Sequence, residues 1–210
     1  MGSSSLTTRP SPADLRRLVQ SLHPLDHPDR ELPVGGYPEA RMKDDANRAA
    51  VLVPILKGER PSILLTVRNR QLTKHAGQVA LPGGRRDRGE PFPLGTALRE
   101  ASEEVGIPAE SVQALGLLGR VNTISQFRIT PVVGLVSEHV EPVSCPDEVS
   151  HLYRLPLDWA LDSARYRQHE VIRSGQRFTV MSMAAHHWPI WGATASILYQ
   201  LALASKELER

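Results

Sequence analysis

Three glutamates in the stretch "ALREASEEVGI", residues 97–107, have a spacing that could bind a metal ion. Glu100, Glu103 and Glu104 lie at i, i+3 and i+4, so on a helix they share one face. Like charges at these spacings destabilise an isolated helix by about 0.2–0.5 kcal/mol per pair, and the helix dipole disfavours anions near the C-terminal end. A divalent cation would offset this cost, since Mg²⁺ commonly takes one or two carboxylates plus substrate phosphates. Three glutamates alone are more often a solvated acidic face, so the interpretation depends on the flanking residues.

Those flanking residues resemble the Nudix box. The run "REASEEVGI", residues 99–107, matches the second half of that motif at every specified position. The first half matches as Gly84, five residues and Glu90. The spacer from Glu90 to Arg99 has eight residues where the general pattern has seven, which weakens any role carried over to Glu90. A chance match of six specified positions is very improbable in a chain of this length.

The resemblance implies an enzyme that cleaves a diphosphate linked to another moiety, by attack of water on phosphorus, with Mg²⁺ or Mn²⁺ as cofactor. Metal ions mask the charge of the diphosphate and lower the pKa of a bound water. By resemblance, Glu100 and Glu104 are the principal metal ligands and Glu103 is a further ligand or a partner of the water. Gly84 would bring its backbone close to the metal, and Arg99 would hold a carboxylate in place. The general base stays open.

A second stretch, "LLTVRNRQLTKHAGQVALPGG" (residues 64–84), is similar to the signature that precedes the box in coenzyme A pyrophosphatases. It departs from that signature at Asn69, at Thr73 where arginine is expected, and at Leu81 where phenylalanine is expected. The eight-residue spacer and the run "WGATASIL" near the C-terminus also look like this subgroup. The matching positions, at preserved intervals, are Leu64, Leu65, Thr66, Arg68, Gly77, Pro82, Gly83 and Gly84.

This subgroup implies coenzyme A or a derivative as substrate, with 3′,5′-ADP and 4′-phosphopantetheine as products. The 3′-phosphate calls for cations, and Arg68, Lys74 and His75 are the candidates for substrate-phosphate contacts. Each could instead be an ordinary surface cation. Trp188 and Trp191 could line a pocket for adenine or pantetheine, although packing in a core or interface is the more frequent role of tryptophan.

Two other functions remain open on the sequence. One is a Nudix hydrolase for another nucleoside diphosphate derivative, such as ADP-ribose, NADH or a dinucleoside polyphosphate. The other is a non-catalytic nucleotide-sensing module of the same fold. Sensing modules usually lose the carboxylates of the box, whereas Glu100, Glu103 and Glu104 are all present.

The elements that must position these residues begin at Ala49. Apolar runs at 49–56 and 61–69 flank "KGER" and predict a hairpin. Further strands are predicted for 77–84, 112–125, 127–139 and 148–156, and a hairpin around "RSGQ" at 169–184. The helices are predicted at 11–22, 94–105 and 192–208, with a short one after Pro156. This order predicts an α/β (α+β) fold of the Nudix type, an α/β/α sandwich with a mixed sheet and helices on both faces. We expect residues 1–45 to form an N-terminal helix and arm, and residues 46–210 the Nudix hydrolase domain.

The composition excludes several other classes. In 210 residues, 40% are hydrophobic and 23% charged, and no apolar run approaches the ~18 residues of a membrane span. A net charge of +2 does not favour nucleic acid as a partner. Cys145 is the sole cysteine, which excludes an intramolecular disulfide and a thiolate zinc cluster. We expect a cytoplasmic enzyme of small-molecule substrates, with a homodimer possible.

Overall fold

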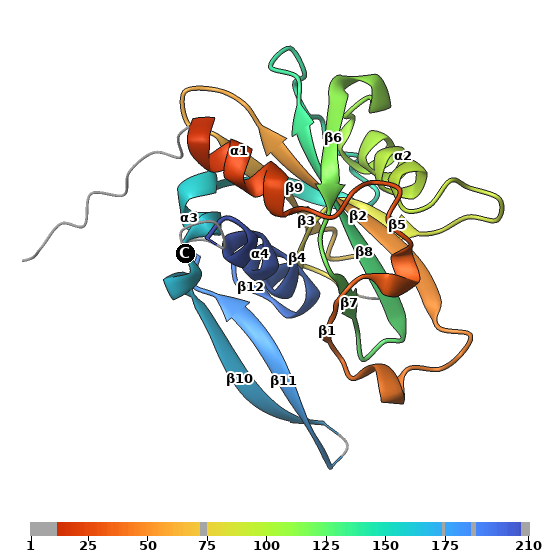
Figure 1. Cartoon of the computed structure of the whole chain (residues 1–210). Coiled ribbons are helices and arrows are strands. Elements are labelled where there is room, and N and C mark those ends of the chain that lie inside the picture. The colour runs from red at the N-terminus through yellow and green to blue at the C-terminus, as the bar shows by residue number, and fades with distance from the viewer. Residues whose placement is uncertain (1–11, 72–74, 174, 186–187, 207–210) are drawn as a thin grey trace, which may run out of the picture.

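The computed structural model describes residues 12–71, 75–173, 175–185 and 188–206. Strands β1 to β9 form one mixed sheet, and β10 to β12 form a smaller antiparallel sheet (Figure 1). The strands of the large sheet are β1 (Val34–Gly36), β2 (Asn47–Leu56), β3 (Ser62–Arg68), β4 (Val79–Ala80), β5 (Gly83–Arg85), β6 (Val112–Leu117), β7 (Arg120–Asn122), β8 (Phe127–Val136) and β9 (Val149–Pro156). The small sheet consists of β10 (Tyr166–Arg173), β11 (Gln176–Met183) and β12 (Ile190–Trp191). The α-helices are α1 (Pro12–Ser21), α2 (Leu94–Val105), α3 (Leu157–Leu161) and α4 (Gly192–Ala204).

Strand β2 is the centre of the large sheet. It pairs in parallel with β8 along its whole length, and on its other edge with β5 and β3. A strand that is covered on both faces needs apolar side chains pointing both ways, which explains the uninterrupted run at residues 49–56.

Successive side chains of β2 enter two separate cores, because they point to opposite faces of the sheet. Val51, Val53 and Ile55 pack in a core that contains the buried face of α4. Ala50 and Leu52 pack in a second core with Ala97, Ala101 and Val105 of α2. Helices therefore cover both faces of a mixed sheet, which confirms the predicted α/β/α arrangement (Figure 1).

Helix α2 has the predicted bounds. It follows Pro93 and ends at Val105, and the next residue, Gly106, adopts the left-handed conformation with φ 64°. Glycine is common at this position because it has no Cβ to clash there. The predicted hairpin of β2 and β3 is present, and so are the hairpin of β10 and β11 and the C-terminal helix.

The strand predicted for 112–125 is broken into β6 and β7. Both pieces pair with β8, but they use different parts of it and are separated at Leu118 and Gly119. A Cβ on Gly119 would lie 3.0 Å from the carbonyl oxygen of Pro33, so the N-terminal arm approaches closely at the break.

The N-terminal arm joins the large sheet through β1, which the sequence did not predict. Val34–Gly36 pairs in parallel with Arg120–Asn122 of β7. Gly36 adopts φ 79°, and a Cβ there would overlap the carbonyl oxygen of Asn122. Glu39 lies just beyond β1 and accepts hydrogen bonds from Asn122 Nδ2 at 2.6 Å and from Arg128 Nη2 at 3.2 Å.

Candidate active site

Glu104 is a buried carboxylate on α2, and its side chain has only 4% exposure. Its Oε2 accepts a hydrogen bond from the Gly83 N–H at 3.2 Å, and its Oε1 lies 3.6 Å from Arg68 Nη1. Burial raises the pKa of Glu104 to about 7, although the Gly83 N–H and Arg68 act in the opposite direction. Nearby negative charge on Glu100 and Glu148 adds to the rise in this pKa. A cation bound beside Glu104 would stabilise the ionised carboxylate and lower this pKa.

Arg99 holds the other carboxylates of the motif together. Its Nε donates to Glu90 Oε1 at 2.9 Å, and its Nη1 lies 2.9 Å from Glu100 Oε1 and 2.8 Å from Glu103 Oε2. Its Nη2 donates to the carbonyl of Arg85 at 3.2 Å. The planar guanidinium can serve several oxygens at once because its donors are fixed in a fork.

Glu100 lies directly against the backbone of β5. A Cβ on Gly84 would overlap the Glu100 carboxylate, so only glycine leaves room for this side chain. Burial raises the pKa of Glu100, and Arg99 counteracts that rise. The carboxylates of Glu100 and Glu104 and the backbone of Gly84 therefore meet at one place.

Glu90 reaches Arg99 in spite of the longer spacer. It accepts hydrogen bonds from Thr96 Oγ1 at 2.6 Å, from Arg99 Nε at 2.9 Å and from the Asp87 N–H at 3.2 Å. Burial raises the pKa of Glu90, but these hydrogen bonds outweigh burial and leave the pKa below its usual value. Glu90 is thus held as an anion that orients Arg99.

A cavity of about 890 Å³ opens over this place. Glu100, Glu104, Gly83 and Gly84 line it beside the central strand. The other walls come from the arm after β1, the turn from β7 to β8, strand β11 and the start of α4. A cavity of this size and mixed polarity is typical of a small-molecule site.

The structure brings most of the predicted residues to this cavity. Arg68 and His75 line it together with Glu100, Glu104 and Gly84, and Lys74 lies outside the described residues. Glu103 and Arg99 contact one another, and neither is among the residues that line it. The side chain of Glu103 is 59% exposed.

Other lining residues carried no signal in the sequence. Glu148, just before β9, faces Glu100 and Glu104 closely enough to raise the pKa of both. Its loop is anchored by Asn69, which donates its N–H to the Glu148 carbonyl and its Nδ2 to the Pro146 carbonyl, both at 2.8 Å. Asn69 is one of the departures from the flanking signature, and no local pattern links it to residue 148.

The tryptophans separate in the structure. Trp191 lines the cavity with 46% exposure, whereas Trp188 packs against the core that contains α4 and lies beside His151, with ring centroids 5.6 Å apart. Trp188 therefore packs against the core, and Trp191 is the tryptophan that lines the cavity.

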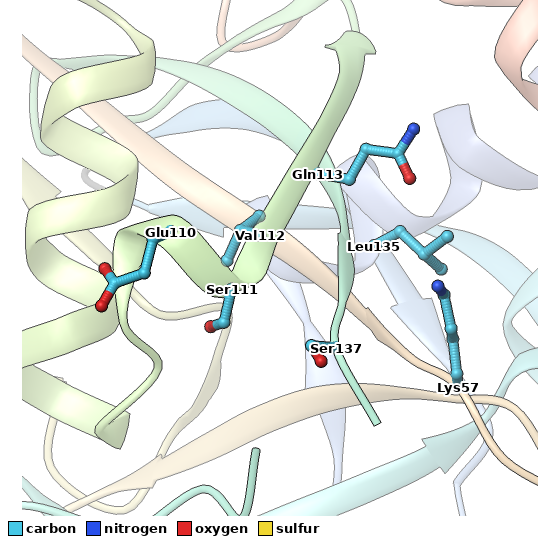
Figure 2. A pocket seen from close by; sticks show the side chains of 7 residues that line it. All are labelled: Lys57, Glu110, Ser111, Val112, Gln113, Leu135 and Ser137. Carbon is cyan, nitrogen blue, oxygen red and sulfur yellow. The ribbon is translucent and has the colours of Figure 1, made fainter. Parts of the chain in front are cut away.

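A second cavity, of about 440 Å³, lies over β6 and β8 (Figure 2). Its ionisable side chains are Lys57 and Glu110, and Figure 2 shows them pointing in different directions. It contains none of the residues predicted for chemistry.

Comparison with known proteins agrees with this geometry. Residues 46–175 match the NUDIX domain family. The chain belongs to the Nudix family. It is 45% identical to the Nudix hydrolase NudL of Pectobacterium atrosepticum, over 79% of this chain and 86% of that protein. It is 42% identical to NudL of Citrobacter koseri, over 74% of this chain and 81% of that protein.

Solved structures of Nudix proteins are also similar to the chain. The Nudix hydrolase of Alicyclobacillus acidocaldarius covers 79% of this chain, and 95% of its own length, at 19% identity and a TM-score of 0.49. RenU of M. smegmatis covers 58% of this chain and 81% of its own, at 26% identity and a TM-score of 0.46.

Membership of this family makes the chain a Nudix hydrolase. Such enzymes act on small nucleoside diphosphate derivatives and generally use divalent metal ions. None of the helices in the described part of the chain is long and apolar enough to span a membrane.

Proposed function

We propose that this Nudix hydrolase cleaves the diphosphate of coenzyme A or its derivatives, giving 3′,5′-ADP and 4′-phosphopantetheine. The observation that carries the proposal is one cavity in which Arg68 and His75, from the segment similar to coenzyme A pyrophosphatases, lie with Glu100 and Glu104. Residues of that segment and of the general motif thus line a single cavity.

The donor set at this site fits Mg²⁺ or Mn²⁺. In residues 12–71, 75–173, 175–185 and 188–206, no three acidic, histidine or cysteine side chains converge into a ready metal-binding group. Two carboxylates, Glu100 and Glu104, line the cavity beside the Gly84 backbone. Mg²⁺ commonly takes one or two carboxylates and completes its shell with water and substrate phosphates, so two suffice. Bound there, the cation would screen the diphosphate and acidify a water.

The protein's own residues hold the parts of the reaction in place. Glu104 is fixed by the Gly83 N–H and Arg68, and Glu100 is fixed by Arg99. Arg68 has a buried Nε without a hydrogen-bond partner and contacts Glu104 only at 3.6 Å, so it keeps donors for a phosphate oxygen. In the reaction, an oxygen of water bonds to one phosphorus and the bridging P–O bond breaks, which leaves two phosphate monoesters.

The test is product analysis with Mg²⁺ or Mn²⁺ on a panel of substrates. The panel contains coenzyme A, oxidised coenzyme A, acetyl-coenzyme A, NADH, ADP-ribose and diadenosine polyphosphates. We expect 3′,5′-ADP from the coenzyme A compounds and slower turnover of the others. Preferred turnover of ADP-ribose or NADH would contradict the substrate, and silence across the panel with nucleotide bound would favour a sensing module.

A further inference from the structure

The far wall of the cavity contains an aromatic pair from two distant parts of the chain. Tyr37 follows β1 and Phe178 lies on β11, and their ring centroids are 5.7 Å apart with planes inclined by 32°. Both side chains are half-buried and both line the cavity. Figure 1 shows the hairpin of β10 and β11 projecting from the body of the molecule, below α4.

This pair lies well away from the carboxylates. From β1 to β5 the sheet order is β1, β7, β8, β2 and β5, which is four steps between neighbouring strands. At about 4.8 Å a step, Tyr37 is on the order of 15–20 Å across the sheet from Gly84. The aromatic pair and the carboxylates therefore form separate parts of one cavity.

Asn122 adds a buried hydrogen-bond acceptor to the same wall. Its residue exposure is 2%, and it lines the cavity. Its Nδ2 donates to Glu39 Oε2 at 2.6 Å, and because a carboxylate only accepts, this bond fixes which end of the amide is the oxygen. The remaining atom, Oδ1, is buried without a hydrogen-bond partner. A buried acceptor of this kind is costly unless a ligand donates to it.

Two arginines close in sequence to the aromatic pair also line the cavity. Arg41 lies on the arm, four residues after Tyr37, and Arg177 precedes Phe178, and both line the cavity. The Arg177 side chain is 75% exposed and has Glu170 Oε2 at 3.5 Å from its Nη1, so it is free to turn toward an anion.

Resting on the proposed function, we propose that Tyr37, Phe178 and Asn122 form the base subsite of this enzyme. The rings take the face of an adenine, and Asn122 Oδ1 accepts a hydrogen bond from its exocyclic amine. Arg41 and Arg177 take the adjacent ribose phosphate. Tyr37 and Phe178 both lie outside residues 46–175, so the aromatic part of this subsite comes from segments beyond the part matched by the family, whereas Asn122 lies within it. The uncharged, non-aromatic pantetheine arm would use neither the rings nor the cations.

The test is calorimetric titration of the two product halves separately. We expect Tyr37→Leu and Phe178→Leu to weaken binding of 3′,5′-ADP at least about tenfold, because aromatic stacking on a base is a major part of such affinity. Binding of 4′-phosphopantetheine should stay unchanged. Ile172→Ala is the matched control, since Ile172 lies in the same hairpin, is 68% exposed and is not part of the cavity lining.

A ligand change tests Asn122 without disturbing its hydrogen bond to Glu39. Inosine 3′,5′-bisphosphate replaces the amine with a carbonyl, so it should bind the unaltered protein about tenfold more weakly than 3′,5′-ADP. Equal affinity for both ligands would overturn the role of Asn122. Unchanged 3′,5′-ADP binding in both leucine variants, a loss confined to 4′-phosphopantetheine, or no binding of 3′,5′-ADP to the unaltered protein would overturn the subsite.

Hydrolysis of coenzyme A, measured on the same preparations, separates the two proposals. Turnover with no effect of the leucine variants on 3′,5′-ADP binding refutes the subsite and leaves the proposed function intact. A variant-sensitive 3′,5′-ADP site without turnover refutes the function and supports the subsite.

Discussion

The glutamates around α2 differ in their surroundings although they are close in sequence. Glu104 is buried beside the Gly83 N–H, and Glu100 lies against Gly84. Glu103 is mostly exposed to solvent and forms an ion pair with Arg99. Glu90 is tied to Arg99 from the loop before the helix. Glu100 and Glu104 have raised pKa values, whereas the pKa of Glu90 is lowered. We propose that Glu100 and Glu104 are the metal-binding pair and that Glu90 supports them through Arg99.

Glu104→Gln tests this division directly. The substitution keeps the shape of the side chain and removes its charge, so we expect the fold to persist while kcat for coenzyme A falls at least about 100-fold. Steady-state kinetics at saturating Mg²⁺ measures the loss. The matched control is Glu110→Gln, an exposed glutamate at the other cavity, which should retain full activity. Equal activity of the two variants would refute the role of Glu104.

Glu104 also predicts a pH dependence of the metal-free protein. Its pKa is about 7 in the folded protein, against an ordinary glutamate value of 4.5 in the unfolded chain, so below pH 4.5 it is protonated in both states. Between these values the unfolded chain loses its proton first, and the free energy of unfolding falls as pH rises toward 7, by roughly 1–3 kcal/mol. Urea unfolding in EDTA at pH 5 and pH 8 measures this fall.

The fall should be smaller in Glu104→Gln, which cannot ionise, and the part that remains is expected from Glu100, whose pKa is also raised. Mg²⁺ should stabilise the unaltered protein at pH 8 more than the variant, because the cation binds the ionised carboxylate. An identical pH dependence in the two proteins would show that another group causes it.

At the scale of elements, local sequence patterns predicted the elements that are formed by interactions between residues close in the chain. Helix α2 has its predicted bounds because its apolar spacing and Gly106 act within a few residues. Strand β1 escaped prediction because its partner, β7, lies more than eighty residues away and "VGG" has no periodicity. The same holds for Glu148, which Asn69 anchors beside the carboxylates from a separate part of the chain. The motif predicted the carboxylates at the cavity, and tertiary pairing supplied most of its other walls.

Glu39 helps to hold the N-terminal arm against the sheet. Replacing Glu39 tests how much it contributes to stability. Glu39 bonds to Asn122 and Arg128 and lies 3.4 Å from Arg120 Nη2, whose side chain is only 9% exposed. Glu39→Ala leaves Arg120 and Asn122 with fewer partners, so we expect a loss of about 1–3 kcal/mol in the free energy of unfolding. Urea titration measures it.

Glu31→Ala is the control for that substitution, because Glu31 lies on the same arm and its side chain is 55% exposed beside Arg30. It should change stability by less than about 0.5 kcal/mol. A Glu39→Ala protein as stable as this control would mean that Glu39 does not help to hold the arm.

At the scale of the whole molecule, we propose that segments outside the family-matched range add to substrate choice. The family-matched residues, 46–175, contain Arg68, Glu100 and Glu104. The arm, β11 and the start of α4 lie outside that range and line another part of the cavity. Changes in those outer segments should therefore alter KM and substrate preference more than the rate of the chemical step.

The most direct test of the central claim is a competition experiment. Coenzyme A and ADP-ribose are mixed at equal concentration with the unaltered enzyme and Mg²⁺, and the initial rates of 3′,5′-ADP and AMP formation are measured together. Their ratio is the ratio of the two kcat/KM values. We expect 3′,5′-ADP to form at least about tenfold faster than AMP. The reason is that coenzyme A carries a ribose 3′-phosphate for Arg41 and Arg177 to bind, and ADP-ribose lacks it. Faster formation of AMP would contradict the account.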